Sequence, residues 1–341
     1  MSEWQTFCLK DLGKIVGGAT PPTNNPKNYG NKIAWITPKD LSTLQGRYIK
    51  KGSRSISRLG FKSCSCALLP KHAILFSSRA PIGYVAIAEK RLCTNQGFKS
   101  IIPNKKIYFE FLYYLLKYHK DNISNIGGGT TFKEVSGATL GLFQVKIPPT
   151  YYEQQKIART LSILDQKIEN NHKINDLLHT LAYKIYEYYF KYKPKNAKLE
   201  QIIIENPKSS IMVKNAQKTQ DKYPFFTSGD NILSYPKSII DGRNCFLNTG
   251  GNAGIKFYVG KASYSTDTWC ICANEFSDYL YLLLSSIKTH INQSFFQGTS
   301  LKHLQKNLLK KYPIYMPSVH EIKKFNQIMM PLLTLISINT R

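Results

Sequence analysis

The chain has 341 residues and a formal net charge of +26, from 47 Lys plus Arg against 21 Asp plus Glu. Such a surplus is typical of proteins that bind a polyanion, and nucleic acid is the leading candidate. Because arginine supplies only eight of the basic residues, a lysine-rich surface that is merely solvated is the alternative. The 42% hydrophobic content argues against a disordered chain, and no apolar run approaches the roughly 18 residues of a membrane span.

The first five residues form neither the basic region nor the apolar core of an export signal, so we expect a cytoplasmic protein. The seven cysteines include two Cys-x-Cys pairs, at 64/66 and 270/272, and none has the Cys-x-x-Cys spacing of a zinc site. Alternate residues of a strand face the same side, which predicts that both pairs are small buried strand residues. We therefore expect no metal site.

An internal duplication is the most informative feature of the sequence. Five short patterns recur in the same order at offsets of about 168 to 171 residues. The matched segments are 76–83 with 247–254, 94–98 with 265–269, 111–116 with 279–284, 129–131 with 298–300, and 147–149 with 315–317. This period is far longer than the roughly 20 to 50 residues of a solenoid repeat, so we predict two diverged copies of one domain.

The first domain, residues 1–150, is predicted to mix short strands with helix. Its apolar runs of strand length, bounded by Gly, Pro or Asn, lie at 33–36, 73–76, 84–87 and 98–102. Residues 110–117 have a helical pattern instead. This mixture is typical of an α+β domain.

A helical spacer, residues 151–192, is predicted to follow, because residues 153–190 contain neither Gly nor Pro. At about 1.5 Å per residue, such a helix of ~38 residues extends about 57 Å. Its apolar residues step by three and four, as a coiled-coil seam requires. The seam residues are Ile157, Leu161, Leu164, Ile168, Leu178, Leu181 and Ile185. Polar residues 170–172 interrupt this stripe, where they could fix the register of a partner helix.

The second domain, residues 193–318, repeats the pattern of the first. Predicted strands lie at 224–226, 245–247 and 257–259, and a predicted helix lies at 278–285. A second, shorter helix, residues 319–341, follows Pro317, and Pro331 is expected to kink or break it. We expect a fold of two similar mixed α/β domains, separated by long helices that pair antiparallel as a coiled coil.

Several motifs occur in a fixed order along the chain. They are residues 18–22 leading to 33–41, residues 94–98, residues 128–131, and the proline-closed strand 147–149 that enters a helix at 153–158. On these motifs and the duplication, nearly the whole chain resembles the specificity subunit of a type I restriction-modification system.

This resemblance implies two target-recognition domains, each reading one half of a split, asymmetric site in double-stranded DNA, with the helices setting the gap. It also implies a subunit without a catalytic centre, which docks two methyltransferase subunits and, through them, restriction (motor-nuclease) subunits. S-adenosylmethionine, ATP and Mg are then expected in those partners, and no cofactor in this chain. Because the family has two comparably long helices, the short second helix is compatible with a truncated or partner-completed subunit.

Polar, glycine-containing loops at matched places in both domains are the candidate DNA-binding segments. Asn, Gln, Arg and Lys read bases, whereas Lys, Arg, Ser and Thr also contact phosphates. For each single residue the alternative is an ordinary polar turn. The predicted DNA-binding residues are Asn24, Asn25, Lys27, Asn28, Lys39, Ser78, Arg79, Asn95, Gln96, Thr130, Thr131, Lys133, Ser228, Asn231, Asn248, Asn252, Thr266, Asp267, Gln297, Thr299, Ser300 and Lys302.

Catalytic motifs are not found in the sequence. It contains no Gly-x-x-x-x-Gly-Lys-Ser/Thr loop and no Asn-Pro-Pro-aromatic motif of an amino-methyltransferase. The single Glu-x-Lys, at 321–323, has no Asp placed before it as a metal-dependent nuclease would need. We therefore expect a non-catalytic protein. The alternative is a stand-alone DNA-acting enzyme, nuclease or integrase-like, with a degenerate site.

Overall fold

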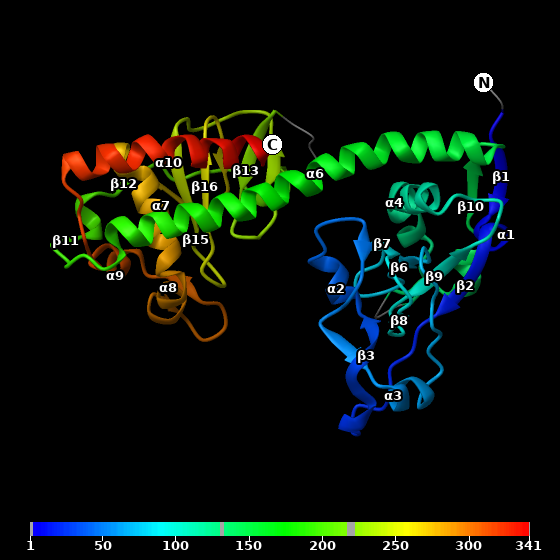
Figure 1. Ribbon diagram of the computed structural model, residues 1–341. Helices are drawn as coiled ribbons and strands as arrows, with labels where there is room; N and C mark the ends of the chain where they lie inside the picture. Colours follow the sequence, from blue (N-terminus) through cyan, green and yellow to red (C-terminus); the bar gives the residue numbers. More distant parts are fainter. Residues whose placement is uncertain (1–2, 130–132, 217–221, 341) are drawn as a thin grey trace. The chain divides into compact units, whose positions relative to one another are not determined.

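Helix α6 (Tyr151–Tyr186) is the longest element of the computed structural model, which describes residues 3–129, 133–216 and 222–340 (Figure 1). A π-helical turn, Glu187–Lys191, continues it, so the long helix expected from the sequence is confirmed. The chain divides into two compact units, Met1–Asn170 and Asn171–Arg341, and α6 contributes one part to each. Both units mix strands with helices, as expected for the α+β class.

The main sheet of the first unit has five strands in the order β2-β9-β6-β7-β4. Their bounds are β2 (Gly13–Gly17), β9 (Lys99–Pro103), β6 (Ile74–Phe76), β7 (Val85–Ala88) and β4 (Tyr48–Ile49). Helix α4 (Phe109–Asn125) packs on β6 and β7 through Leu112 and Leu116, which are fully buried. The core of this unit also includes Ala158 of α6, which anchors the first part of that helix.

A second sheet of the first unit has the order β5-β3-β8, and its strands are β5 (Arg54–Ile56), β3 (Tyr29–Ile36) and β8 (Cys93–Thr94). Strands β1 (Gln5–Cys8) and β10 (Gln144–Ile147) form a separate antiparallel pair. The remaining short helices are α1 (Leu9–Leu12), α2 (Pro38–Ser42), α3 (Arg58–Lys62) and α5 (Gly137–Leu142), together with a 3-10 turn, Pro26–Asn28.

The second unit repeats this plan. Its main sheet has the order β12-β18-β15-β16, with β12 (Ile204–Glu205), β18 (Thr268–Cys272), β15 (Arg243–Asn248) and β16 (Ile255–Val259). A smaller sheet has the order β14-β13-β17, with β14 (Leu233–Tyr235), β13 (Tyr223–Phe226) and β17 (Ser263–Tyr264). Its central strand β13 pairs parallel to β17, as β3 pairs parallel to β8 in the first unit.

Two short antiparallel pairs complete the strands described in the second unit. They are β11 (Ala197–Lys198) with β21 (Pro313–Ile314) and β19 (Phe296–Gln297) with β20 (His303–Leu304). The α-helices described in this unit, besides its part of α6, are α7 (Ser277–Ser286), α8 (Lys288–Ser294), α9 (Lys306–Lys310) and α10 (Val319–Asn339).

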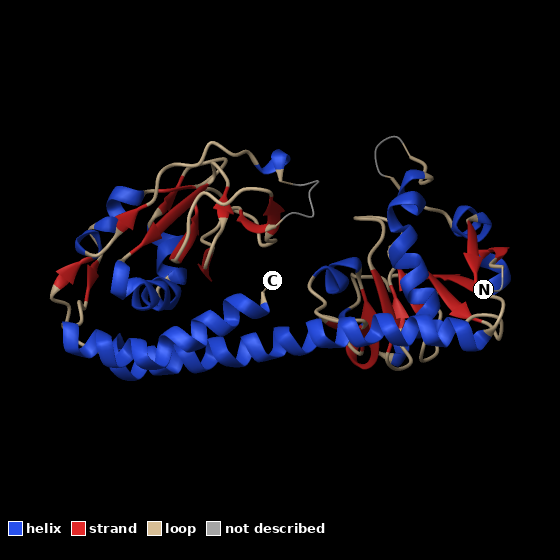
Figure 2. Cartoon of the chain, turned by 90° about the horizontal axis from the view of Figure 1, so that it is seen from above, coloured by secondary structure: helices blue, strands red, loops and turns tan. Residues whose placement is uncertain are grey.

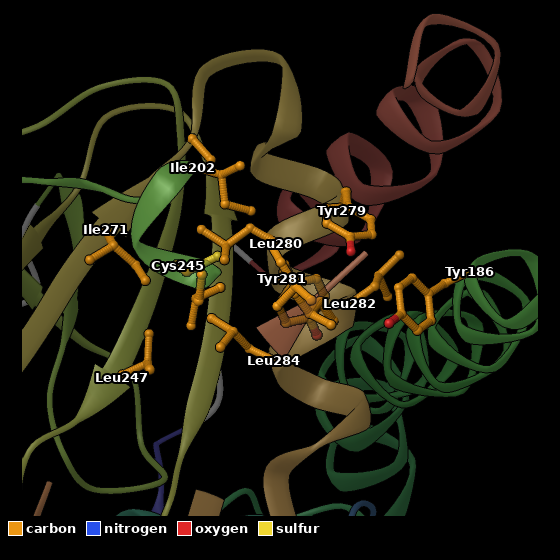
Figure 3. Close-up of a cluster of buried hydrophobic side chains, with 14 of the residues drawn as sticks. Tyr186, Ile202, Cys245, Leu247, Ile271, Tyr279, Leu280, Tyr281, Leu282 and Leu284 are labelled. Carbon is orange, nitrogen blue, oxygen red and sulfur yellow. The ribbon is translucent and has the colours of Figure 1, made fainter. Parts of the chain in front are cut away.

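The larger of the described core clusters of the second unit lies between its main sheet and α7. Figure 3 shows Leu280 and Leu284 of α7 beside Cys245 of β15, and all three side chains are buried. Tyr186 of α6 joins this core, with its ring centroid 5.9 Å from that of Tyr279. The second part of α6 is therefore held by apolar packing on α7.

Helix α10 lies antiparallel beside the second part of α6, as both views show (Figures 1 and 2). The side-chain amide of Asn175 donates to the carbonyl oxygen of Ile336 over 3.2 Å, and Asn339 donates to Asn175 Oδ1 over 3.0 Å. At the other end of the pair the rings of Tyr189 and Phe325 are 6.0 Å apart. The antiparallel helix pair is thus confirmed, and the asparagine that fixes its register is Asn175, outside the polar segment 170–172.

Of the kink or break expected at Pro331, the break does not occur, because α10 contains this proline and continues to Asn339. Met329 and Leu333 on either side of it are buried in the core, and this packing offsets the lost backbone hydrogen bond. At the other end, Ser318 and Glu321 form a capping box. Hydrogen bonds from the Ser318 backbone and from Tyr315 lower the pKa of Glu321 to about 2.

The strand prediction for the cysteine pairs was half right. Cys270 and Cys272 lie in β18, whereas Cys64 and Cys66 follow α3 in a loop. The Cys64 thiol donates to the Gly60 carbonyl of that helix over 3.5 Å, so its position is set by a helix end. In the described parts of the chain no three His, Cys, Asp or Glu side chains form a group that could hold a metal ion. No described helix is both long and apolar enough to cross a membrane.

Candidate nucleic-acid interface

In the first unit, three loops meet at Ser78, two residues after the end of strand β6. The Ser78 N–H donates to the carbonyl of Gly97 over 2.8 Å, and the Ser78 carbonyl accepts from the Val135 N–H over 3.0 Å. The loop after β6 is thereby joined to the loop after β8 and to the segment before α5. Ser78 itself is buried, so this predicted DNA-binding residue acts as part of the scaffold.

The second unit contains the same junction at Thr249. Its N–H donates to the carbonyl of Asp267 over 3.2 Å, and its carbonyl accepts from the Leu304 N–H over 3.0 Å. Thr249 therefore corresponds to Ser78. The duplication seen in the sequence thus extends to this pair of backbone hydrogen bonds, although the acceptor Asp267 aligns with Gln96, one residue before the counterpart of Gly97.

We call the segments that converge at these two junctions the tip loops. In the first unit they are residues 17–20, 77–84, 94–98, 127–129 and 133–134, and in the second unit 227–231, 248–254, 265–268 and 297–303. Most of the predicted DNA-binding residues lie on them.

A further tip loop of the first unit crosses over residues 94–96. The Ala19 N–H donates to the Thr94 carbonyl over 3.0 Å, and the Thr20 hydroxyl donates to the side-chain oxygen of Gln96. A Cβ atom on Gly18 would lie 2.1 Å from the carbonyl oxygen of Asn95, so only glycine allows the two backbones to approach this closely. The close approach of the two backbones thus explains why the motif at 18–22 begins with glycine.

In the second unit the side chain of a strand lysine forms hydrogen bonds with two tip loops. Lys256 of β16 donates to the Thr227 carbonyl over 2.8 Å, and its ammonium lies 3.5 Å from Asn248 Oδ1. Burial lowers the pKa of Lys256. Lys256 is not among the residues predicted from the sequence, although a lysine inside the apolar strand Ile255–Val259 is a signal that could have identified it.

A carboxylate of the first unit was also missed. Glu134 follows the predicted DNA-binding residue Lys133, and its side chain is 3.5 Å from Arg79 and 3.4 Å from Lys99. The ion pair with Glu134 holds the side chain of Arg79, which is the one arginine among the predicted DNA-binding residues.

The tip loops bring many predicted residues together and expose some of them. The exposed ones are Gln96, Lys133, Asn231, Asn252, Asp267, Gln297, Thr299, Ser300 and Lys302. Arg79, Asn95, Ser228 and Thr266 are half-buried, and Asn248 is buried. Thr130 and Thr131 lie outside the described residues.

The predicted segment 24–28 is organised around helix α3 and not around the tip loops. The Asn28 carbonyl accepts from the Ser57 N–H over 2.9 Å, and its buried side chain donates to the Pro22 carbonyl over 2.9 Å. Asn25 accepts from the Lys27 N–H over 3.1 Å, while Asn24 and Lys27 are exposed. Lys39 is exposed on α2. Asn25 and Asn28 therefore stabilise the loop.

The predicted seam residues of α6 differ in burial. Ile157 packs against the core of the first unit, and Leu178 and Ile185 pack against the core of the second. The other four are exposed: Leu161 by 36%, Leu164 by 55%, Ile168 by 54% and Leu181 by 47%.

These features define a class of protein: two homologous domains, each with a polar loop junction, joined by a long helix. The chain belongs to the family described as the type I restriction modification DNA specificity domain, which matches residues 1–180 and 195–341. The family expected from the sequence motifs is thereby confirmed.

Two curated relatives share substantial identity with the chain. The type I restriction enzyme MjaIX specificity subunit of Methanocaldococcus jannaschii is 45% identical over 191 residues, which are 55% of this chain and 44% of that protein. The HindI specificity subunit of Haemophilus influenzae is 31% identical over 187 residues, 51% of this chain and 40% of that protein. The matches therefore span less than half the length of these relatives.

A solved structure has the same fold. The crystal structure of a type I restriction-modification system S subunit from M. genitalium matches with a TM-score of 0.59, covering 99% of this chain and 91% of that chain at 15% sequence identity. At this identity the likeness concerns the fold alone.

Proposed function

We propose that this chain is the DNA sequence-recognition subunit of a type I restriction-modification complex. Each unit reads one half of a split, asymmetric site in double-stranded DNA through its tip loops. The observation that carries this proposal is the paired junction at Ser78 and Thr249, where a similar pair of backbone hydrogen bonds supports different side chains. A shared scaffold with different exposed groups is what two readers of unlike half-sites require.

The charge of the chain supports DNA as the ligand. With a net charge of +26, the surface attracts the phosphate backbone, and counterion release adds affinity that does not depend on sequence. The exposed Asn, Gln and Lys side chains of the tip loops supply the donors and acceptors that base edges recognise.

An apolar face of the helix pair supports docking of partner subunits. On α6, Ile174, Leu177 and Leu181 are 43%, 70% and 47% exposed, and on α10, Ile328, Leu335 and Ile338 are 42%, 42% and 58% exposed. Helical spacing places each set along one stripe, on the side away from the core. An exposed apolar stripe on two neighbouring helices fits the helices of another protein, as in a helix bundle.

We assign this face to two methyltransferase subunits, which in turn hold the restriction subunits. S-adenosylmethionine, ATP and Mg are expected to bind those partners, and the chain contributes recognition without catalysis. A cytoplasmic location stays a prediction. The alternative of a stand-alone nuclease or integrase-like enzyme is not favoured, because the chain belongs to a specificity-domain family.

The test is to express the chain with its methyltransferase and to sequence the methylated bases of the host genome. We expect one bipartite motif with two unlike half-sites and a fixed gap. In parallel, the purified chain alone is incubated with DNA, Mg²⁺ and S-adenosylmethionine, and we expect neither cleavage nor methylation. Cleavage by the chain alone would support the enzyme alternative, and methylation of a short continuous motif would contradict two separate readers.

A further inference from the structure

Arg79 and Glu134 form a cation–carboxylate pair at the tip-loop junction of the first unit. Arg79 Nη1 lies 3.5 Å from Glu134 Oε2, and Lys99 Nζ lies 3.4 Å from Glu134 Oε1. The side chains of Arg79 and Glu134 are 38% and 35% exposed, so the pair lies at the surface. One terminal nitrogen makes this contact, and a guanidinium has five N–H donors in a fixed fork.

The backbone beneath both side chains is fixed by hydrogen bonds. Arg79 follows Ser78, whose N–H and carbonyl are both bonded within the junction. Glu134 exchanges two backbone hydrogen bonds with Gly128, over 2.9 and 3.0 Å. Side chains on such a support keep a defined position, which base recognition needs more than phosphate contact does.

The second unit has different residues at the same two positions. Since Thr249 corresponds to Ser78 and Leu304 to Val135, the counterparts of Arg79 and Glu134 are Gly250 and His303. These two residues form an isolated β-bridge with each other, and His303 is exposed. The same place in the fold therefore carries an arginine–carboxylate pair in one unit and a glycine with a histidine in the other.

We infer that Arg79 reads a guanine in the half-site of the first domain and that Glu134 is a positioning residue for its guanidinium. This inference rests on the proposed function and deepens it. A bidentate contact from arginine to guanine O6 and N7 is the commonest specific contact in the major groove. A neighbouring carboxylate weakens attraction for phosphate but restricts the orientation of the guanidinium, which favours bidentate base contact.

The test substitutes Arg79→Lys in the full chain, and measures sequence preference by selection from randomised duplex DNA and by competition binding. Lysine keeps the charge but loses the planar fork. We expect the preference for G at one position of one half-site to fall by roughly 5- to 150-fold. The other half-site and the salt dependence of binding to unrelated DNA are expected to stay unchanged.

Glu134→Gln tests the positioning role, because it removes the charge and keeps the shape. We expect a smaller loss of preference at the same base pair, with an unchanged melting temperature. A merely structural role would instead lower the melting temperature and weaken all positions of that half-site. Arg91→Lys is the matched control, because this exposed arginine lies in the turn at the other end of β7 and should change nothing.

Two results would overturn the assignment. Uniformly weaker binding to all sequences would make Arg79 a phosphate contact, and an unaltered preference in Arg79→Lys would show that the planar guanidinium does not read the base. If either result is obtained while the unsubstituted chain still selects two half-sites, the proposed function is unaffected. If the unsubstituted chain selects no bipartite sequence, the proposed function fails and the assignment of Arg79 fails with it.

Discussion

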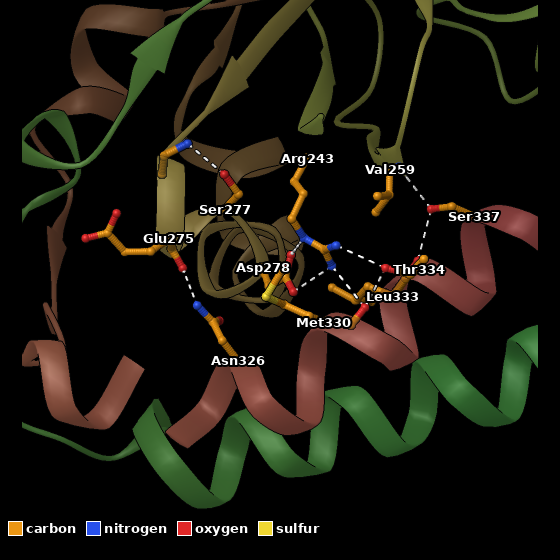
Figure 4. A network of polar contacts seen from close by, with 11 residues as sticks. Arg243, Val259, Glu275, Ser277, Asp278, Asn326, Met330, Leu333, Thr334 and Ser337 are labelled. Atoms are coloured by element: carbon orange, nitrogen blue, oxygen red, sulfur yellow. Dashed lines mark hydrogen bonds and ion pairs between the residues drawn. The ribbon is translucent and has the colours of Figure 1, made fainter. Parts of the chain in front are cut away.

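The buried ion pair between Arg243 of β15 and Asp278 of α7 offers the sharpest test of how the second unit is held together. Arg243 Nε and Nη2 donate to the two carboxylate oxygens of Asp278 over 2.6 and 2.8 Å, and the Asp278 side chain is only 2% exposed. Arg243 also donates to Thr334 Oγ1 over 3.0 Å and to the Met330 carbonyl over 3.3 Å. Figure 4 shows this arginine connecting the sheet, α7 and α10.

Arg243→Met keeps a long apolar stem but leaves the buried carboxylate without its cation. Removing one partner of a buried pair costs about 3–5 kcal/mol, because the remaining charge is neither solvated nor compensated. Since a domain is stabilised by roughly 5–15 kcal/mol, this loss removes a substantial part of the free energy of unfolding of the second unit. The matched control is Lys198→Met, whose ion pair with Glu200 spans 4.0 Å with side chains 61% and 45% exposed. That exposed pair should contribute less than about 1 kcal/mol.

The loss of stability in Arg243→Met should also depend on pH. Burial raises the pKa of Asp278, and the hydrogen bond from Arg243 acts in the opposite direction. In the variant the folded-state pKa therefore rises further above the unfolded value, so the folded state binds the proton more tightly. Stability is then retained at low pH and lost as the pH rises through the folded-state pKa. The difference from the unsubstituted chain should be larger at pH 7 than near pH 4.

The assay is urea unfolding of the full chain, with hydrogen exchange of α7 and α10 peptides as the local measurement. Adding Asp278→Asn to Arg243→Met removes the uncompensated charge and should recover part of the loss at pH 7. If Arg243→Met costs no more than Lys198→Met, or if its cost does not change with pH, the carboxylate is solvated and the reasoning is wrong.

The remaining predictions concern DNA. The affinity for DNA should fall steeply with salt, with log K changing by about −0.9 per log salt for each neutralised phosphate, and a flat response in a salt titration would contradict phosphate contacts. Replacing residues 1–150 with the equivalent domain of a relative should change one half-site in methylome mapping, and a change in both would contradict independent readers. Four helix-forming residues inserted after Ile168 should lengthen α6 by ~6 Å and turn it by ~40° beyond a full rotation. The gap between half-sites should then grow by about one or two base pairs, at ~3.4 Å each, and an unchanged gap would show that α6 does not set it. Lys256→Met should reduce discrimination only in the half-site of the second domain, whereas equal loss in both halves would argue against a local role.

The sequence by itself determined the architecture of this protein. The repeated patterns predict two copies of one domain, and the shared hydrogen bonds at Ser78 and Thr249 have the same origin. The absence of Gly and Pro between 153 and 190, together with apolar residues that step by three and four, predicts α6. Both signals are local properties of the chain, so the sequence encodes them directly. The family also follows from the order of motifs along the chain.

Only the tertiary structure decided which polar residues form the candidate interface. Asn28 and Arg79 are equally plausible DNA contacts in the sequence, yet Asn28 is buried in a loop contact and Arg79 lies at the surface beside Glu134. Likewise, α10 continues through Pro331 because buried neighbours stabilise it, and Asn175 fixes the helix pair through residues about 160 positions away. Such contacts join segments far apart in the chain, so no local pattern records them. The physical reason is that exposure and pairing are properties of the packed molecule, whereas periodicity and repeats are properties of the chain.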